Sequence, residues 1–249
     1  MKHQSTRALV WLSLLLSLWL VGGSALAQEA AIRKALTERL PNLPKIDEIT
    51  KSPITGLYEV RFGGTQIMYS DANGDFVLVN AALIDTKTRT DLTEARIDKL
   101  SAIDFDKLPV KDAVVITQGT GLRKLAVFGD PNCGYCKRFE RDLATLKDVT
   151  IYTYLMPILG PDSTVKSRDI WCAKDPAKTW RAWMVDNVVP PKSAAVCDSA
   201  AIERNLELSK KHRITGTPAL VFENGMRKPG ALAAAEVERL LTASARKPG

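Results

Sequence analysis

Cys133 and Cys136 are the residues of this sequence whose type and spacing most directly indicate chemistry, because two thiols separated by two residues can close a small disulfide that reopens readily. The apolar run 125–128 predicts a buried strand, residues 129–132 have turn composition, and residues 137–146 have helical spacing. Cys133 therefore lies at the start of a helix, where unpaired N–H groups and the helix dipole favour a thiolate. This setting predicts a redox-active thiol pair.

Two other uses of the pair have less support. A structural zinc site needs four closely grouped ligands. The other cysteines, Cys172 and Cys197, stand far apart, and the two histidines are His3 near the N-terminus and His212. A purely structural disulfide across two residues would constrain the unfolded chain little. We therefore expect redox chemistry that uses no metal and no cofactor.

The N-terminus has the pattern of a secretory signal peptide. Lys2 and Arg7 precede an apolar stretch over 8–21, and small residues follow up to Ala27. We expect cleavage after Ala27, which makes 1–27 the signal peptide. The alternative is an uncleaved membrane anchor, but the apolar stretch is short for a span of about 20 residues. The mature protein is expected outside the cytoplasm, where disulfides persist.

Length and charge limit the partners. Removing 27 residues from 249 leaves 222, enough for two domains. The formal net charge of +7 falls to +5 once Lys2 and Arg7 are removed. The remaining basic residues are scattered among acidic ones, without the interleaved aromatics of a strand-binding protein, so we expect no nucleic-acid partner.

Residues 28–90 predict a small α+β domain. It contains a helix that Pro41 ends, and a hairpin signal at Asn73-Gly74. The expected strands are 46–50, 57–62, 65–69 and 76–79. The domain contains no cysteine and no histidine, so we expect it to bind rather than react. Because no lysine or proline interrupts 57–69, we expect strands 57–62 and 65–69 to form the sheet edge that pairs with a second copy.

A helical linker is expected over 91–106, followed by a second domain over 107–249. The order of its elements is β-α-β, a helical insertion over 162–210, and β-β-α, which is that of a thioredoxin fold with an inserted helical part. The remaining elements are expected at 114–116, 125–128, 149–155, 217–222 and 231–244. Thr217-Pro218 stands at the start of a buried strand, where proline is out of place unless its position is special.

Three motifs in this order give the chain a family resemblance. They are Asn132–Cys136, the Trp171-Cys172 segment with the later Cys197-Asp198, and Gly216–Ala219. With the leader and the cysteine-free domain, the chain resembles the periplasmic disulfide isomerases of the DsbC/DsbG family. The resemblance implies a periplasmic homodimer, V-shaped and joined through cystatin-like N-terminal domains, with an apolar cleft for misfolded, disulfide-containing exported proteins.

The resemblance also implies roles for individual residues. Cys133 and Cys136 are the catalytic pair, and Cys172 and Cys197 form a structural disulfide. Gly134, Tyr135, Thr217 and Pro218 contact the substrate, and the Thr217–Pro218 peptide bond is cis in related thioredoxin-like folds. A membrane reductant of the DsbD type keeps the catalytic pair reduced.

The expected mechanism is thiol-disulfide exchange. Cys133, with an exposed sulfur, attacks a wrong disulfide, and the shielded Cys136 resolves the mixed disulfide. Lys137 stands where this family often has histidine. The Gly134-Tyr135 dipeptide lacks the proline of cytoplasmic thioredoxins, and the apolar strand before the motif contains no acid. We therefore expect no buried acid near the cysteines, and an oxidising pair. The alternatives are a thiol oxidase of the same superfamily and a periplasmic holdase chaperone that binds unfolded chains.

Overall fold

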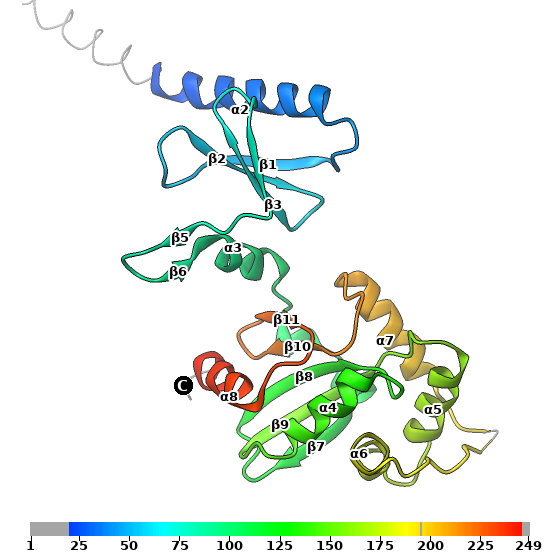
Figure 1. Cartoon of the computed structure of the whole chain (residues 1–249). Coiled ribbons are helices and arrows are strands. Elements are labelled where there is room, and N and C mark those ends of the chain that lie inside the picture. The colour runs from blue at the N-terminus through cyan, green and yellow to red at the C-terminus, as the bar shows by residue number, and fades with distance from the viewer. Residues whose placement is uncertain (1–19, 195, 246–249) are drawn as a thin grey trace, which may run out of the picture. The chain divides into compact units, whose positions relative to one another are not determined.

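The computed structural model describes residues 20–194 and 196–245. The chain divides into two compact units, Met1–Leu100 and Ser101–Gly249, and Figure 1 labels most of their helices and strands. Most of the expected signal peptide lies outside the described residues, and the chain from Leu20 onward is already helical. Across the described ranges, no helix is both long and apolar enough to cross a membrane.

The first unit is an antiparallel sheet with a helix packed on it, as expected from the sequence. Its four-stranded sheet has the order β1-β2-β3-β4, and β5 and β6 form a separate hairpin. The elements are α2 (Leu20–Arg39), β1 (Ile46–Lys51), β2 (Leu57–Phe62), β3 (Gln66–Asp71), β4 (Val77–Val79), β5 (Ile84–Asp85), β6 (Thr90–Asp91) and α3 (Leu92–Ser101).

The core of this unit follows from the helical spacing of α2. Ile32 and Leu36 lie one turn apart on the same face and pack with Val60 and Met68 of the sheet. The turn between β3 and β4 packs closely against α2. At Gly74, where φ is +68°, a Cβ atom would lie 2.9 Å from the Cβ of Ala35, so the close approach requires glycine.

The strand order shows that the expected sheet edge is wrong. Strand β2 (57–62) pairs with β1 and β3, and β3, which covers most of 65–69, pairs with β2 and β4. Both are therefore inner strands, and β1 and β4 form the edges. Alternating polarity shows that a segment is a strand but carries no information on its neighbours.

The helix expected over 91–106 is shorter, because α3 ends at Ser101. It is tied to the first unit: Arg96 donates hydrogen bonds to Glu48 at 2.7 Å and to Glu59 at 3.1 Å. Soon after its end the chain joins the second unit, where the Ile103 N–H donates to the Gly225 carbonyl at 2.9 Å.

The second unit is a five-stranded sheet of order β11-β10-β8-β9-β7, in which only β8 and β9 are parallel. Strand β11 is the second of the two strands expected after the insertion, and the last helix starts three residues later than expected. The elements are two 3₁₀ turns, η1 (Phe105–Lys107) and η2 (Val110–Asp112), then β7 (Val114–Gln118), β8 (Arg123–Gly129), α4 (Gly134–Leu143), β9 (Val149–Leu155), α5 (Pro161–Trp171), α6 (Pro176–Asp186), α7 (Ala200–Lys211), β10 (Ala219–Phe222), β11 (Arg227–Pro229) and α8 (Ala234–Ser244).

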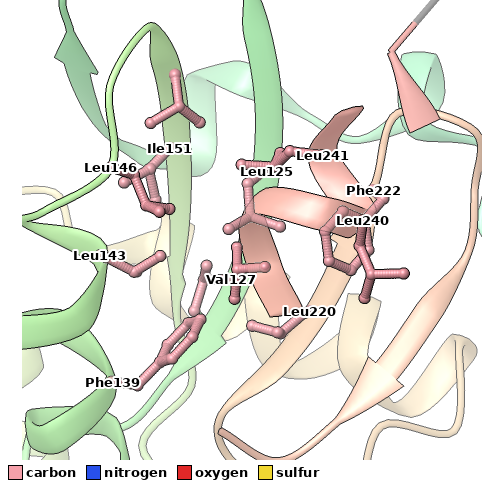
Figure 2. Close-up of a cluster of buried hydrophobic side chains, with 12 residues drawn as sticks. Leu125, Val127, Phe139, Leu143, Leu146, Ile151, Leu220, Phe222, Leu240 and Leu241 are labelled. Atoms are coloured by element: carbon pink, nitrogen blue, oxygen red, sulfur yellow. The ribbon is translucent and has the colours of Figure 1, made fainter. Parts of the chain in front are cut away.

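Apolar layers cover both faces of this sheet. Along β8, Leu125 and Val127 point to one face and Ala126 and Phe128 to the other, as the period of a strand requires. Figure 2 shows the first layer, in which side chains of α4 and α8 pack on β8, β9 and β10. Two-sided burial explains why 125–128 is a continuous apolar run.

The insertion expected over 162–210 consists of three helices, α5, α6 and α7, with an irregular segment between α6 and α7. Helix α6 ends at Asp186, and its C-cap residue Asn187 adopts a left-handed conformation with φ 57°. Helix α6 packs on α4, the helix that follows the C-x-x-C motif. The insertion therefore forms part of the surroundings of the thiol pair.

Candidate active site

Cys133 is the N-cap residue of α4. The helix begins at Gly134, earlier than the helical pattern over 137–146 indicates, and ends at Leu143. The Cys133 Sγ atom accepts a hydrogen bond from the Cys136 N–H at 3.2 Å. A negative charge on this sulfur would therefore receive an N–H group of the first helical turn and the positive end of the helix dipole.

The Thr217–Pro218 loop lies beside this sulfur. Its peptide bond is cis, and Cys133 Sγ is 3.4 Å from the Thr217 carbonyl oxygen, although the two residues are 84 positions apart. The Pro218 carbonyl accepts a 2.8 Å hydrogen bond from Gly230 just after β11, which holds the loop. The structure thus brings together segments that the sequence separates.

Gly134 and Tyr135, the two residues between the cysteines, border open space. A Cβ atom on Gly134 would meet no atom within 4 Å, and the Tyr135 side chain is exposed. The four residues expected to contact substrate thus lie either within the C-x-x-C motif or in the loop next to Cys133. A chain approaching Cys133 can reach both segments.

The expected exposure of Cys133 is wrong. Its relative exposure is 5%, close to the 2% of Cys136, and both cysteines belong to one buried cluster with Ile170, Trp180 and Met184 of the insertion. The sequence could not show that the insertion folds over the motif. The two cysteines therefore differ in chemical surroundings more than in exposure.

Those surroundings act strongly on Cys136. Burial raises the pKa of the Cys136 thiol, and a hydrogen bond with Cys133 raises it further, whereas the Asp130 N–H and the Thr217 side chain act in the opposite direction. Cys136 is thus held as a thiol in the reduced pair. Both Cys133 and Cys136 are free thiols in this structure.

The absence of a buried acid near the pair was also a wrong expectation. Glu140 lies on the buried face of α4, one turn beyond Cys136, and its Oε1 accepts a 2.8 Å hydrogen bond from Trp180 Nε1. Burial raises the pKa of Glu140 to about 7, although the Trp180 hydrogen bond and the charge of Arg181 act to lower it. Its position four residues after Cys136 was the signal in the sequence that could have revealed it.

Asp130 is a second buried acid, placed in the turn between β8 and the motif. Its side chain is fully buried, and each carboxylate oxygen accepts two hydrogen bonds. Oδ1 accepts from Asn132 N at 2.7 Å and Ser163 Oγ at 2.8 Å, and Oδ2 accepts from Ile158 N at 2.8 Å and Leu159 N at 3.0 Å. Because four donors surround it, this carboxylate is a structural anchor of the turn at residues 129–132, the proposed catalytic turn.

Lys137, in the position where histidine was expected from the family, packs against the insertion. Its ammonium group lies 3.7 Å from the ring centroid of Trp183 and donates to Asn187 Oδ1 at 2.6 Å. Burial lowers the pKa of Lys137, and the nearby charge of Lys166 lowers it further. The ammonium group of Lys137 is thus held in place by side chains at the end of α6.

Cys172 and Cys197 form a disulfide with a Cα–Cα distance of 6.0 Å. The bond joins the end of α5 to the irregular segment before α7, and the Trp171 indole N–H donates to the Asp198 carbonyl at 3.1 Å alongside it. The pair therefore closes the insertion. No group of residues suited to hold a metal ion occurs in the part of the chain that the structure describes.

Comparison with known proteins agrees with this architecture. Residues 110–245 match the thioredoxin-like domain family, and residues 23–94 match the N-terminal domain family of disulfide bond isomerase proteins. The crystal structure of a disulfide interchange protein from Neisseria gonorrhoeae is 33% identical, with a TM-score of 0.53, and the match covers 56% of this chain and all of that one. The fold and the thiol pair define a thiol-disulfide oxidoreductase with an isomerase-type N-terminal domain.

Relatives that match over most of this chain define the family further. The probable thiol:disulfide interchange protein DsbC of Bordetella parapertussis is 44% identical over 214 residues, covering 86% of this chain and 74% of the relative. The DsbC protein of Escherichia coli K12 is 26% identical, covering 84% and 85%. The chain belongs to the DsbC family of thiol:disulfide interchange proteins.

Proposed function

We propose that this protein is a disulfide isomerase that rearranges wrong disulfides in exported proteins, with Cys133 as the attacking thiol. The observation that carries the proposal is the placement of Cys133 Sγ between the Cys136 N–H and the Thr217 carbonyl. The N–H group donates a hydrogen bond to the sulfur, and the carbonyl marks the place where an extended substrate chain would lie beside it.

The reaction proceeds by exchange. The Cys133 thiolate attacks one sulfur of a client disulfide, which forms a mixed disulfide and releases the other client sulfur as a thiolate. A different client thiolate then attacks the mixed disulfide, forms a new client disulfide and returns Cys133 to its thiolate form. If the client does not rearrange, Cys136 loses its proton and attacks Cys133, which releases a reduced client and leaves Cys133 and Cys136 oxidised.

The surrounding residues have proposed roles in binding the client chain. Thr217 and Pro218 offer backbone groups to an extended segment, and the absence of a side chain on Gly134 leaves room for it. Tyr135, exposed in the first turn of α4, offers an apolar ring next to Cys133. None of these contacts requires a specific client sequence, which suits an enzyme with many clients.

We place the protein in the periplasm, after removal of residues 1–27. The leader pattern supports export, and the Cys172–Cys197 disulfide suits an oxidising compartment. Such a compartment oxidises an accessible thiol pair, so an isomerase there needs a source of electrons. We propose a membrane reductant of the DsbD type, which would exchange with Cys133 and Cys136.

We propose that the mature protein is a homodimer joined through residues 28–90, at the outer edge of β4. Phe76, Leu78 and Val79 lie on or beside this short edge strand with exposed side chains. Pairing of two such edges would satisfy free backbone groups and cover the apolar side chains. Two catalytic units in one dimer would hold a misfolded client during repeated exchange.

The test is recovery of activity by scrambled ribonuclease in a glutathione buffer. The mature protein in its reduced form is expected to speed recovery well beyond the buffer alone. The Cys133→Ser protein is the matched control and is expected to match the buffer. Equal acceleration by the Cys133→Ser protein would show a chaperone effect without exchange, and no acceleration by the native protein would refute the proposal.

A further inference from the structure

The loop between β9 and α5 has an unusual composition for a surface loop. It contains Ile158 and Leu159, whose relative exposures are 39% and 56%. Exposing two adjacent large aliphatic side chains to water is unfavourable, because burying them would stabilise the folded protein. Single exposed apolar residues need no explanation, but a pair fixed beside a reactive centre does.

Asp130 places this loop next to the catalytic turn. Its Oδ2 atom accepts the N–H groups of both Ile158 and Leu159, at 2.8 and 3.0 Å, while Oδ1 accepts the N–H of Asn132 at 2.7 Å. Asn132 directly precedes Cys133. One buried carboxylate therefore holds the backbone of the apolar loop and the backbone leading to the reactive cysteine.

Further links make the connection rigid. The Asn132 side chain donates to Asp162 Oδ2 at 2.7 Å and to Ser163 Oγ at 3.1 Å, at the start of α5. The Met156 N–H donates to the Gly129 carbonyl at 2.8 Å, before the loop begins. The loop is thus bonded to the catalytic turn at both of its ends.

We propose that Ile158 and Leu159 bind an apolar stretch of the client chain that flanks the attacked disulfide, and that Asp130 is the positioning residue that holds this surface beside Cys133. The inference rests on the proposed function. A misfolded client exposes apolar segments, and its chain must pass Cys133 when its disulfide is attacked. The surface is continuous with the catalytic turn, so the flanking segment meets it in the same encounter.

The test compares three disulfide substrates with the mature, reduced protein. One is a peptide disulfide flanked by leucine and valine, the second has serine and glycine in those places, and the third is oxidised glutathione. The Ile158→Ser/Leu159→Ser protein is expected to react about tenfold more slowly with the apolar peptide. Its rates with the polar peptide and with oxidised glutathione should not change.

Leu122→Ser is the matched control. Leu122 is 76% exposed but precedes β8, whereas the catalytic turn follows the far end of that seven-residue strand, roughly 20 Å away. Its rates should equal those of the native protein. An equal loss in Leu122→Ser, or no loss in the loop variant, would overturn the inference.

Two further results separate this inference from its alternatives. If the loop variant also loses its reaction with oxidised glutathione, the loop acts on Cys133 itself, and the binding surface is refuted. If sedimentation shows a weakened dimer instead, the surface contacts a second copy. Failure of the native protein to react with oxidised glutathione would refute the proposed function rather than this inference alone.

The positioning role of Asp130 has its own readout, the ratio of rates with the apolar and polar peptides. An Asp130→Asn side chain has one acceptor oxygen in place of two, so the loop should detach in part and the ratio should fall. In the loop variant, which has already lost the apolar contact, Asp130→Asn should leave the ratio unchanged. A further fall there would contradict the positioning role, and the loop variant alone tests the surface if Asp130→Asn does not fold.

Discussion

The Trp180 indole N–H donates a 2.8 Å hydrogen bond to the Glu140 carboxylate, and both side chains are buried. The bond joins α6 of the insertion to α4, the helix that starts at the catalytic motif. Trp180 also packs in the cluster that contains Cys133 and Cys136. The insertion therefore supplies both the apolar cover of the thiol pair and the partner of its neighbouring acid.

Glu140 is expected to make stability depend on pH. Burial raises its pKa from the ordinary 4.5 to about 7. The folded protein thus binds the proton more tightly than the unfolded chain. The stabilisation is fully present below pH 4.5 and is lost as the pH rises to about 7, by roughly 3 kcal/mol. Urea unfolding of the native and Glu140→Gln proteins across this range measures the difference.

The stability of native protein relative to Glu140→Gln should fall as the pH rises. Glu207→Gln, an exposed change on α7, is the control and should leave the pH profile unchanged. A constant difference between the native and Glu140→Gln proteins from pH 4.5 to 7.5 would show that Glu140 ionises as an exposed carboxyl does.

Local patterns predicted the parts of this molecule that local physics determines. The apolar run 125–128, the turn at 129–132 and the paired cysteines predicted the strand, turn and helix of the catalytic motif. The sequence also indicates a special position at Thr217-Pro218, because proline is out of place at the start of a buried strand. Only the fold showed that the Thr217 carbonyl lies against Cys133.

What the sequence did not show depends on contacts between distant segments. Strand 57–62 alternates in polarity whether it is an edge or an inner strand, so pairing order had to come from the structure. Cys133 is buried because Trp180 and Met184 fold over it from the insertion. Asp130 had turn composition, which hid its role as a buried acceptor of four hydrogen bonds.

The two active-site cysteines should behave differently when replaced. Cys133→Ser should form no mixed disulfide with clients, because the attacking sulfur is missing. Cys136→Ala should keep part of the isomerase activity and accumulate mixed disulfides, because the resolving thiol is missing. Non-reducing electrophoresis after reaction with a scrambled client measures this difference. Equal amounts of mixed disulfide in both proteins would contradict the assignment.

Loss of the second disulfide should affect stability rather than chemistry. In the chain-entropy model, a bridge across 25 residues contributes roughly 3 kcal/mol. The free energy of unfolding of Cys172→Ser/Cys197→Ser should be lower by that amount, which lowers its urea midpoint. Its reaction with oxidised glutathione should stay within about twofold of native. Mass spectrometry of the unreduced native protein that found both thiols free would contradict the bridge.

The β4 edge can be tested with one charge. Leu78→Lys places an ammonium group on the exposed edge strand, where lysine discourages pairing. We expect the dimer dissociation constant to rise at least tenfold. Ile54→Lys, on an exposed turn of the same unit, is the control and should leave it unchanged. Sedimentation equilibrium makes the measurement, and an unchanged constant for Leu78→Lys would place the interface elsewhere.

An isomerase requires Cys133 and Cys136 to work in the reduced state. The most direct test is to quench cells with acid, so that thiol exchange stops, and then to dissolve the protein in denaturing buffer at neutral pH with an alkylating agent. The alkylated cysteines are then counted by mass spectrometry. We expect alkylation of Cys133 and Cys136, with Cys172 and Cys197 protected by their disulfide. If Cys133 and Cys136 are found joined in most molecules, the protein is an oxidase, and its assignment as an isomerase is wrong.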